Sequence, residues 1–380
     1  MQALKRALPT VAAVAAFVVA LRALAFACAY PAGALYDGDL DAQAELAHGM
    51  ERWVEADLSR DDFATGSSRF DGEWLFATRM MAVLGYAQTA IEHPELAEAH
   101  GRLIDRAIDG LVDEPGRAFD REAWGRDPLD DLGSPRPHVA YLGYLALATS
   151  MARLVNPDSR HAALEQRIVD HLVARFEASE LGLLESYPGE AYPIDNTSFF
   201  GALAVHDRAT GEDHRALITH LCEGLASRYR DPHTGLLYQS VDPEDGGLID
   251  GPRASGTALG AYFVSFADPS LSRALYRSMQ SQLLVRTMGF GTTREYPPGH
   301  EGRGDVDSGP VLLGQGVSAT GFTLALARIH GDRETYEATY ATASFFGGPL
   351  HGNYALGGPI GDGLLFALVT ALPASRWSEA

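Results

Sequence analysis

The feature that most constrains the fold is a long series of helical segments separated by connections of two distinct lengths. From Ala42 onwards apolar residues recur at spacings of three and four, and Gly, Pro and Asp separate the segments, a pattern typical of amphipathic helices. Strand patterns are short and confined to residues 236–240 and 291–296. The predicted helices span residues 41–57, 73–92, 95–112, 137–155, 160–177, 195–209, 213–229, 254–266, 269–287, 310–330, 332–346 and 360–372.

The connections between these helices alternate. Short ones, predicted to join two helices of one hairpin, occupy residues 93–94, 156–157, 210–211, 267–269 and 331–332. Long ones, predicted to link one hairpin to the next, occupy residues 113–136, 178–194, 230–253, 288–309 and 347–359. All long loops then emerge at one end of the molecule. Loops of this length are uncommon in a compact domain, so we expect them to pack together over a shared surface. We therefore predict an all-α fold, an (α/α)6 toroid of six hairpins whose long loops roof a central cavity.

The N-terminus is predicted to be a separate unit, a signal peptide or a transmembrane anchor over residues 1–30. Lys5 and Arg6 precede an apolar run, and small residues around Ala29 suit cleavage by a signal peptidase. The run is also about long enough to cross a bilayer uncleaved. A lipoprotein signal at Cys28 is a weaker match. In each case we expect residues 31–380 to form the toroid and to be exported: periplasmic, extracellular, or held at the membrane by the N-terminal segment.

Composition excludes several classes of function. Fifty acidic residues against thirty Lys and Arg give a formal charge of −20, which repels nucleic acid. The two cysteines cannot build a disulfide framework or a cysteine zinc site in the mature domain. The sequence has no His-Glu-x-x-His pair or other recognised histidine ligand spacing, no Gly-x-Ser-x-Gly and no phosphate loop. We expect a small-molecule substrate, no metal and no cofactor, and leave homo-oligomer formation open.

The richest loop in chemical groups is residues 182–196, Gly-Leu-Leu-Glu-Ser-Tyr-Pro-Gly-Glu-Ala-Tyr-Pro-Ile-Asp-Asn, which runs into a predicted helix. Its prolines and glycines prevent regular structure, and loops on a rigid scaffold often carry binding and catalytic groups. We predict that Asp195 and Glu190 are catalytic and that Ser186, Tyr192 and Asn196 bind substrate. The alternative is that Asp195 or Asn196 simply caps the helix.

A second acidic loop, residues 288–309, is predicted to meet the first over the cavity. Glu295 and Asp307 are candidate catalytic groups, and Asp305 is a candidate substrate-binding group. Opposed carboxyl groups suit general acid–base catalysis when burial or a like charge pushes their pKa values apart.

Two structural alternatives apply to this loop. Asp307 or Ser308 could cap a helix that begins at Pro310. The Asp305-x-Asp307 pair also suggests a calcium site, but the sequence around it lacks the twelve-residue loop and the final glutamate of an EF-hand.

Further substrate-binding candidates lie on predicted helices and near loop ends. Tyr141 and Tyr144 share one side of a helix at a spacing of three, where the alternative is plain core packing. Tyr238 and Arg253 lie in or beside the long loop 230–253 and complete the candidate set.

The order of several short motifs resembles the linalool dehydratase-isomerase family, whose members dehydrate and isomerise monoterpene alcohols without a cofactor. The resemblance extends over residues 75–365 and implies the same toroid. It is carried by Gly125-x-Asp-Pro128, Tyr141-x-Gly143, the loop to Asn196, Asp207-Arg208, Asp231-Pro232, Gly235, Tyr238-x-Ser240, Pro243, Ser255, Asp268-Pro269, Arg294-Glu295, Asp305-x-Asp307-x-Gly309 and the segment Ser318 to Arg328.

The family's catalytic cysteines are replaced here by Ser186 and Asp195, and its helix histidine by Tyr144. The resemblance therefore implies a lyase or isomerase that uses Asp/Glu acid–base chemistry on an alcohol. One alternative is a carbohydrate-active enzyme, a glycoside hydrolase, lyase or epimerase, with Trp124, Tyr187 and Tyr192 as platforms for sugar rings. A second is a non-catalytic binding toroid at the membrane surface, which a dry cavity without convergent acids would favour.

Overall fold

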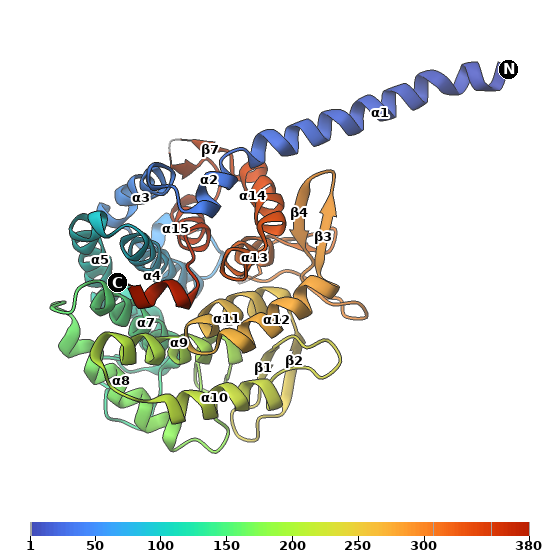
Figure 1. Ribbon diagram of the computed structural model, residues 1–380. Helices are drawn as coiled ribbons and strands as arrows, with labels where there is room; N and C mark the ends of the chain where they lie inside the picture. The colour runs from blue at the N-terminus through green and yellow to red at the C-terminus, as the bar shows by residue number, and fades with distance from the viewer. Residues whose placement is uncertain (1, 307, 351, 380) are drawn as a thin grey trace.

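Two concentric sets of helices build the molecule (Figure 1). The computed structural model describes residues 2–306, 308–350 and 352–379. The inner helices are α4 (Ser68–Glu92), α7 (Val139–Val155), α9 (Pro193–Thr210), α11 (Ala254–Ala267), α13 (Val317–Ile329) and α15 (Gly358–Val369). Each inner helix contacts the next one, and α15 returns to α4, so the ring closes. The predicted (α/α)6 toroid is confirmed.

The outer helices pack outside this ring. They are α3 (Leu40–Glu55), α5 (Ala97–Val112), α8 (Ala162–Glu177), α10 (Arg215–Arg228), α12 (Pro269–Gln282) and α14 (Arg333–Gly347). Their sequences explain the two layers: α7 is buried at nearly every position, whereas α5 buries one stripe around Ile104, Ile108 and Leu111. A helix that is apolar all round needs neighbours on every side, and an amphipathic one suits the surface.

Helix α3 packs against α15 as its outer partner, because the described residues after α15 form only a short 3-10 helix. The Trp53 indole on α3 donates a hydrogen bond of 2.7 Å to Asp362 of α15, and the Tyr354 backbone N–H donates a second, also of 2.7 Å, to the same carboxylate. The first and last helices of the ring are thereby joined across the whole length of the chain.

The long connections contain more structure than the sequence indicated. Helix α6 (Glu114–Trp124) occupies the start of the predicted loop 113–136, because Asp113 accepts a hydrogen bond of 3.0 Å from Gly116 N–H and caps it. The other helical segments of the described residues are the N-terminal α1 (Gln2–Ala29), the short helix α2 (Ala32–Asp37) and three 3-10 helices, η1 (Arg60–Asp62), η2 (Pro94–Leu96) and η3 (Ala374–Glu379).

Four two-stranded hairpins account for the remaining regular structure in the described residues. They are β1 (Tyr238–Val241) with β2 (Leu248–Pro252), β3 (Leu284–Thr287) with β4 (Phe290–Thr293), β5 (Val311–Leu312) with β6 (Gln315–Gly316), and β7 (Pro349–Leu350) with β8 (Asn353–Tyr354). The predicted helices 269–287 and 310–330 are therefore too long at one end: α12 stops at Gln282, and α13 starts at Val317.

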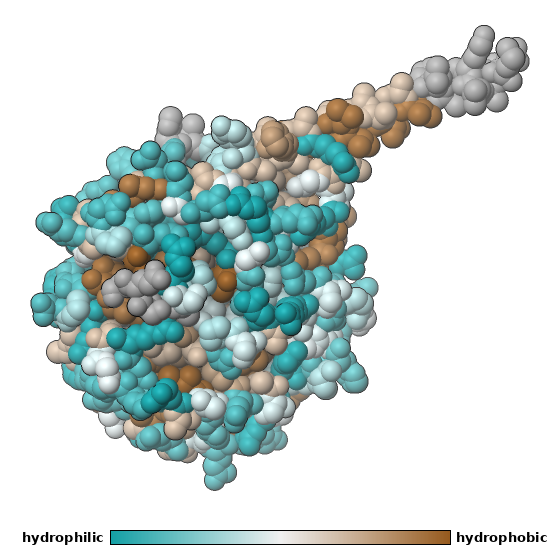
Figure 2. Space-filling view, viewed as in Figure 1, coloured by the Kyte–Doolittle hydropathy of each residue, from teal (hydrophilic) through white to brown (hydrophobic). Residues whose placement is uncertain are grey.

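Helix α1 projects from the toroid (Figure 1), and the part of it that is coloured in Figure 2 presents mostly apolar side chains. Its segment Thr10–Ala29, 20 residues long, is apolar enough to cross a membrane, a property that a signal sequence shares. Only the end of this helix is packed: Ala25 is buried, and α1 contacts α14.

Candidate active site

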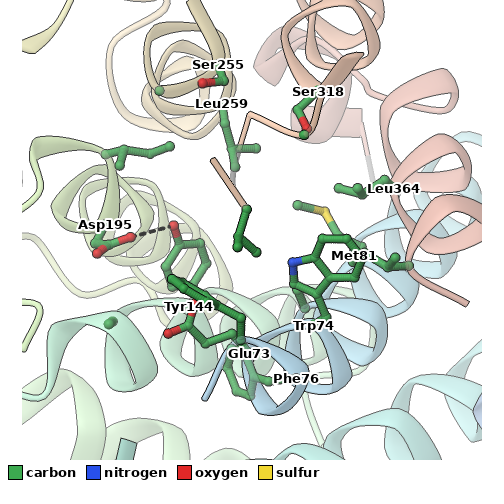
Figure 3. A pocket seen from close by; sticks show the side chains of 18 of the residues that line it. Glu73, Trp74, Phe76, Met81, Tyr144, Asp195, Ser255, Leu259, Ser318 and Leu364 are labelled. Atoms are coloured by element: carbon green, nitrogen blue, oxygen red, sulfur yellow. Dashed lines mark hydrogen bonds between the residues drawn. The ribbon is translucent and has the colours of Figure 1, made fainter. Parts of the chain in front are cut away.

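A cavity of about 630 Å³ occupies the middle of the ring, and all six inner helices line it (Figure 3). Each of them contributes residues from its N-terminal part, such as Tyr144 on α7, Asp195 on α9 and Ser255 on α11. The partial positive charge of a helix N-terminus favours anionic groups, so the cavity suits carboxylates or an anionic transition state.

Asp195 lies on the polar side of the cavity and accepts a hydrogen bond of 2.9 Å from the Tyr144 hydroxyl (Figure 3). Burial raises the pKa of Asp195, and the charge of Glu190 adds to this, against the lowering effect of the Ser186 and Tyr144 hydroxyls and of Arg69. The net direction is upwards. Asp195 is therefore a carboxyl group that holds its proton more readily than an exposed aspartate does.

Neither Asp195 nor Asn196 caps α9. The N-cap residue is Tyr192, and Pro193 occupies the first helical position. Asn196 instead fastens the preceding loop: its amide oxygen accepts from Leu184 N–H at 2.8 Å, and its amide nitrogen donates to the carbonyls of Leu184 and Tyr192 at 3.1 and 3.0 Å. Its contacts are structural.

A second group of polar side chains surrounds Arg69 on α4. Its Nε lies 3.3 Å from Glu73, and its guanidinium stacks 3.6 Å from the centre of the Tyr187 ring. The Tyr187 hydroxyl donates to Glu73 at 2.6 Å, and the Tyr192 hydroxyl donates to Glu190 at 3.0 Å. Two carboxylates, Glu73 and Glu190, thus face the cavity beside one cation.

Sequence reasoning missed Arg69 and Glu73, because it started the helix at residue 73. Even with the correct helix start, a pair spaced by four residues reads as an ordinary surface ion pair. The signal available was the position of Arg69 and Glu73 beside the aromatic residues Phe70, Trp74 and Phe76.

The opposite side of the cavity is apolar (Figure 3). It is formed by Phe70, Trp74, Phe76, Met80, Met81, Phe119, Leu259, Val306, Val317, Phe322, Ile360 and Leu364. These side chains come from four of the inner helices, α4, α11, α13 and α15, from α6 and from the loop before β5. A bound molecule would meet charge on one side and hydrocarbon on the other.

Glu295 does not line the cavity but lies directly behind Ser255, which does. The Ser255 hydroxyl donates to Glu295 Oε1 at 2.5 Å, and Glu295 Oε2 is buried without a hydrogen-bond partner. Burial raises the pKa of Glu295 to about 7, against hydrogen bonds from Ser255. The Ser255 hydroxyl therefore connects the Glu295 carboxyl group to the cavity.

Three predicted binding residues are held elsewhere. Tyr141 is fully buried, because its ring packs against Phe76 and Phe119 and its hydroxyl donates to the Leu111 carbonyl at 2.9 Å. Arg253 forms ion pairs with Asp250 and Asp305, so its charge is already matched. Tyr238 belongs to β1 and does not line the cavity.

Asp305 is engaged by Arg253 and by Ser308, whose backbone N–H donates to Asp305 at 2.9 Å. Those bonds lower the pKa of Asp305 despite its burial. Asp307 lies outside the described residues. The suggestion that Asp307 or Ser308 caps a helix at Pro310 is wrong, because α13 begins at Val317 after Gly316.

Of the three proposed aromatic platforms, Tyr187 and Tyr192 line the cavity. Trp124 does not: its ring lies 4.7 Å from that of His138, centre to centre. His138 is itself buried between Asp120 and Asp131 at 2.6 and 3.0 Å, so this cluster braces the loop before α7.

No known protein-family model matches the sequence. Among solved structures, an inactive variant of an α-1,6-mannanase from Salegentibacter sp. HEL1_6, in complex with α-1,6-mannotriose, matches with a TM-score of 0.53 at 12% identity, over 88% of this chain and 99% of that one. A family 76 glycoside hydrolase from a bovine Bacteroides thetaiotaomicron strain matches with a TM-score of 0.51 at 11% identity, over 80% and 70%. At such identities the likeness concerns the fold.

These matches correct the resemblance to the linalool dehydratase-isomerase family. The solved structures that the toroid resembles are family 76 glycoside hydrolases, and the two described above are not terpene-modifying enzymes. The motifs that suggested the resemblance have a structural origin. Asp268, for example, caps α12 by accepting from Ser270 and Leu271 N–H at 2.9 and 3.0 Å, and Pro269 takes the first helical position. Any toroid with helices in this order needs such caps.

Proposed function

We propose that the chain is a carbohydrate-active enzyme that cleaves a glycosidic bond by acid–base catalysis in the central cavity. The observation that carries the proposal is that two carboxyl groups line one cavity in different surroundings: Asp195 is buried and its pKa is raised, whereas the Glu190 side chain is 43% exposed. Two carboxyl groups in such different surroundings suit the two roles of glycoside hydrolysis. The toroid shared with glycoside hydrolases supports the same choice.

In the proposed reaction Asp195 is the general acid. Its proton passes to the glycosidic oxygen as the bond from that oxygen to the anomeric carbon breaks. Water forms the new bond to the anomeric carbon, and Glu190 accepts the proton that the water loses. Tyr144 is a positioning residue, since its hydroxyl fixes the Asp195 carboxyl group at 2.9 Å. Tyr187 and Tyr192 supply faces against which a sugar ring can stack.

The apolar wall narrows the substrate class. A free oligosaccharide would place its polar groups against the side chains of Trp74, Phe76 and Leu364, so binding would gain little from the hydrophobic effect. A substrate with one sugar and one apolar group would place each against matching surface. We therefore propose an amphiphilic glycoside, with its sugar at the Asp195 side and its hydrocarbon against α4 and α15.

The alternative of a non-catalytic binding toroid is less well supported. A non-catalytic toroid is favoured by a dry cavity without convergent acids, whereas Asp195, Glu190 and Glu73 all line the central cavity of this protein.

The test is hydrolysis of a panel of glycosides, α-mannosides included, each with a methyl, an octyl and an aryl aglycone. Asp195→Asn is compared with Asp158→Asn, an exposed aspartate outside the cavity. We expect turnover of the best octyl or aryl glycoside to fall by roughly 10² to 10⁴ in Asp195→Asn and to stay normal in Asp158→Asn. Near-normal turnover in Asp195→Asn, or no hydrolysis of any member by the wild type, would refute the proposal.

A further inference from the structure

Far from the cavity, three potential metal ligands meet where α9 turns into α10. His206 lies near the C-terminal end of α9, Glu212 follows the turn, and His214 is the N-cap residue of α10. His206 follows Asp195 by eleven positions on one helix, a distance of about 16 Å at 1.5 Å per residue. The cluster is therefore at the other end of the ring from the proposed active site.

One nitrogen of the His206 ring is held by a carboxylate, and the other forms no hydrogen bond. The residue is fully buried, and its Nδ1 lies 2.6 Å from Glu165 of α8. Its Nε2 is buried and has no hydrogen-bond partner. That nitrogen points towards Glu212, whose Oε2 lies 3.3 Å away. A buried polar atom without a hydrogen bond calls for an explanation, and a cation bound between His206 Nε2 and Glu212 would provide one.

His214 is arranged in the same way. Its Nδ1 lies 2.6 Å from Asp207, which also accepts from the His214 backbone N–H at 2.7 Å. Nε2 is the ring nitrogen that remains for a ligand. Histidines that bind metal usually hold a carboxylate or carbonyl on their other nitrogen, which fixes the ring and raises its basicity. Both histidines here have that carboxylate.

We propose that His206, Glu212 and His214 bind a divalent transition metal, Zn²⁺ in particular, with water as the fourth ligand. One donor atom from each residue lies within 4.8 Å of the others. Tetrahedral zinc with ligands at about 2.0–2.1 Å places neighbouring donor atoms about 3.3 Å apart. The observed 3.3 Å between His206 Nε2 and Glu212 Oε2 agrees with that spacing. Imidazole and carboxylate ligands are also the set that zinc accepts.

A metal ion at this site would stabilise the turn between α9 and α10. It joins the end of an inner helix to the start of its outer partner and, through Glu165, to α8. Because Arg153 lies 2.6 Å from Glu165, the charge of that carboxylate is already matched. The charge left for a cation comes from Glu212, with Asp207 behind His214.

A proton is the competitor for this position. Burial lowers the pKa of His206, but the hydrogen bond with Glu165 and the charges of Glu165 and Glu212 outweigh it, and the net direction is upwards. Metal binding must displace that proton, so affinity should weaken as pH falls. The site was not predicted from the sequence, because the spacing from His206 to Glu212 and His214 crosses a turn and matches no common metal motif.

The test uses the full chain in detergent, without a histidine tag and after removal of metals with EDTA. Zn²⁺ is titrated by calorimetry, and Co²⁺ is added in parallel, since its visible absorption reports tetrahedral coordination. We expect one equivalent of either ion to bind and the melting temperature to rise. Glu212→Gln and His214→Ala should each weaken binding at least tenfold. His220→Ala, which removes an exposed histidine of α10 outside the cluster, should leave it unchanged.

Glu212 is 44% exposed, so Glu212→Gln should keep the fold, and an unchanged circular dichroism spectrum would verify this. The proposal is overturned if the wild type binds no stoichiometric Zn²⁺ at neutral pH, or if Glu212→Gln and His214→Ala bind as tightly as the wild type. In either case Glu165 and Glu212 serve only as ion-pair partners of His206.

Discussion

At the scale of the residue, the most informative group outside the proposed catalytic set is Glu295. It is fully buried, one of its oxygens has no hydrogen-bond partner, and the pKa of its carboxyl group is raised from 4.5 to about 7. Its neutral form suits this site, because the desolvated anion would find too few donors. Ser255 connects it to the cavity, so it is a candidate proton reservoir there.

The prediction concerns stability against pH. Because the pKa of Glu295 is raised in the folded state, its contribution is fully present below the unfolded value near 4.5 and is lost as pH rises through about 7. The difference corresponds to about 3 kcal/mol, at about 1.4 kcal/mol for each change of one in pKa. Between pH 5 and pH 8, the free energy of unfolding measured with a chemical denaturant should fall less in Glu295→Gln than in the wild type. Glu98→Gln, an exposed control, should keep the full loss; equal losses in all three proteins would rule the idea out.

At the scale of the element, the width of the cavity depends on how closely the inner helices approach one another. Gly201 on α9 faces α11, and a Cβ added there would lie 2.7 Å from the Phe263 carbonyl oxygen. That oxygen belongs to helix backbone and cannot move alone, so a larger residue must push the two helices apart. Gly224 on the outer helix α10 faces open space.

Gly201→Ala should therefore lower the free energy of unfolding by about 1–3 kcal/mol. It should also reduce turnover, because α9 carries Asp195. Gly224→Ala should raise stability by about 0.5–1 kcal/mol, since alanine removes only the conformational freedom of glycine. Urea unfolding of the two variants checks both signs. If Gly201→Ala were neutral, the helices would be less tightly packed than the structure indicates.

At the scale of the whole molecule, α1 and the toroid are nearly independent. Val11, Val14, Phe17 and Val19 on α1 are exposed to solvent, and packing is limited to its C-terminal end. Long exposed apolar surface of this kind is stable in a membrane or is removed by cleavage.

We predict that the full chain partitions with membranes, whereas residues 31–380 are soluble with nearly the same melting temperature. Cell fractionation followed by thermal unfolding of both forms checks this, and N-terminal sequencing of the purified protein distinguishes an anchor from a cleaved signal. A reporter active only outside the cytoplasm, fused after residue 35, should give signal if the chain is exported. A full chain that stays soluble without cleavage would contradict the prediction.

The sequence by itself determined the helices and the order in which they form hairpins, because apolar periodicity and capping residues act over a few positions. It also identified part of the candidate site: Asp195, Glu190, Tyr144 and Tyr192 line the cavity, and the loop between residues 182 and 196 contains most of them. These residues share a local signal, since polar groups beside Pro and Gly at a helix start are visible without any tertiary contact.

Only the tertiary structure decided which side of each inner helix faces the cavity. Tyr141 and Tyr144 differ by three positions, yet one hydrogen-bonds in the core and the other contacts Asp195. Arg69 and Glu73 became site residues because α15 closes the ring against α4, a contact between opposite ends of the chain. The cluster of His206, Glu212 and His214 likewise exists only because a turn brings together two helix ends. Such positions depend on long-range packing, which local patterns do not encode.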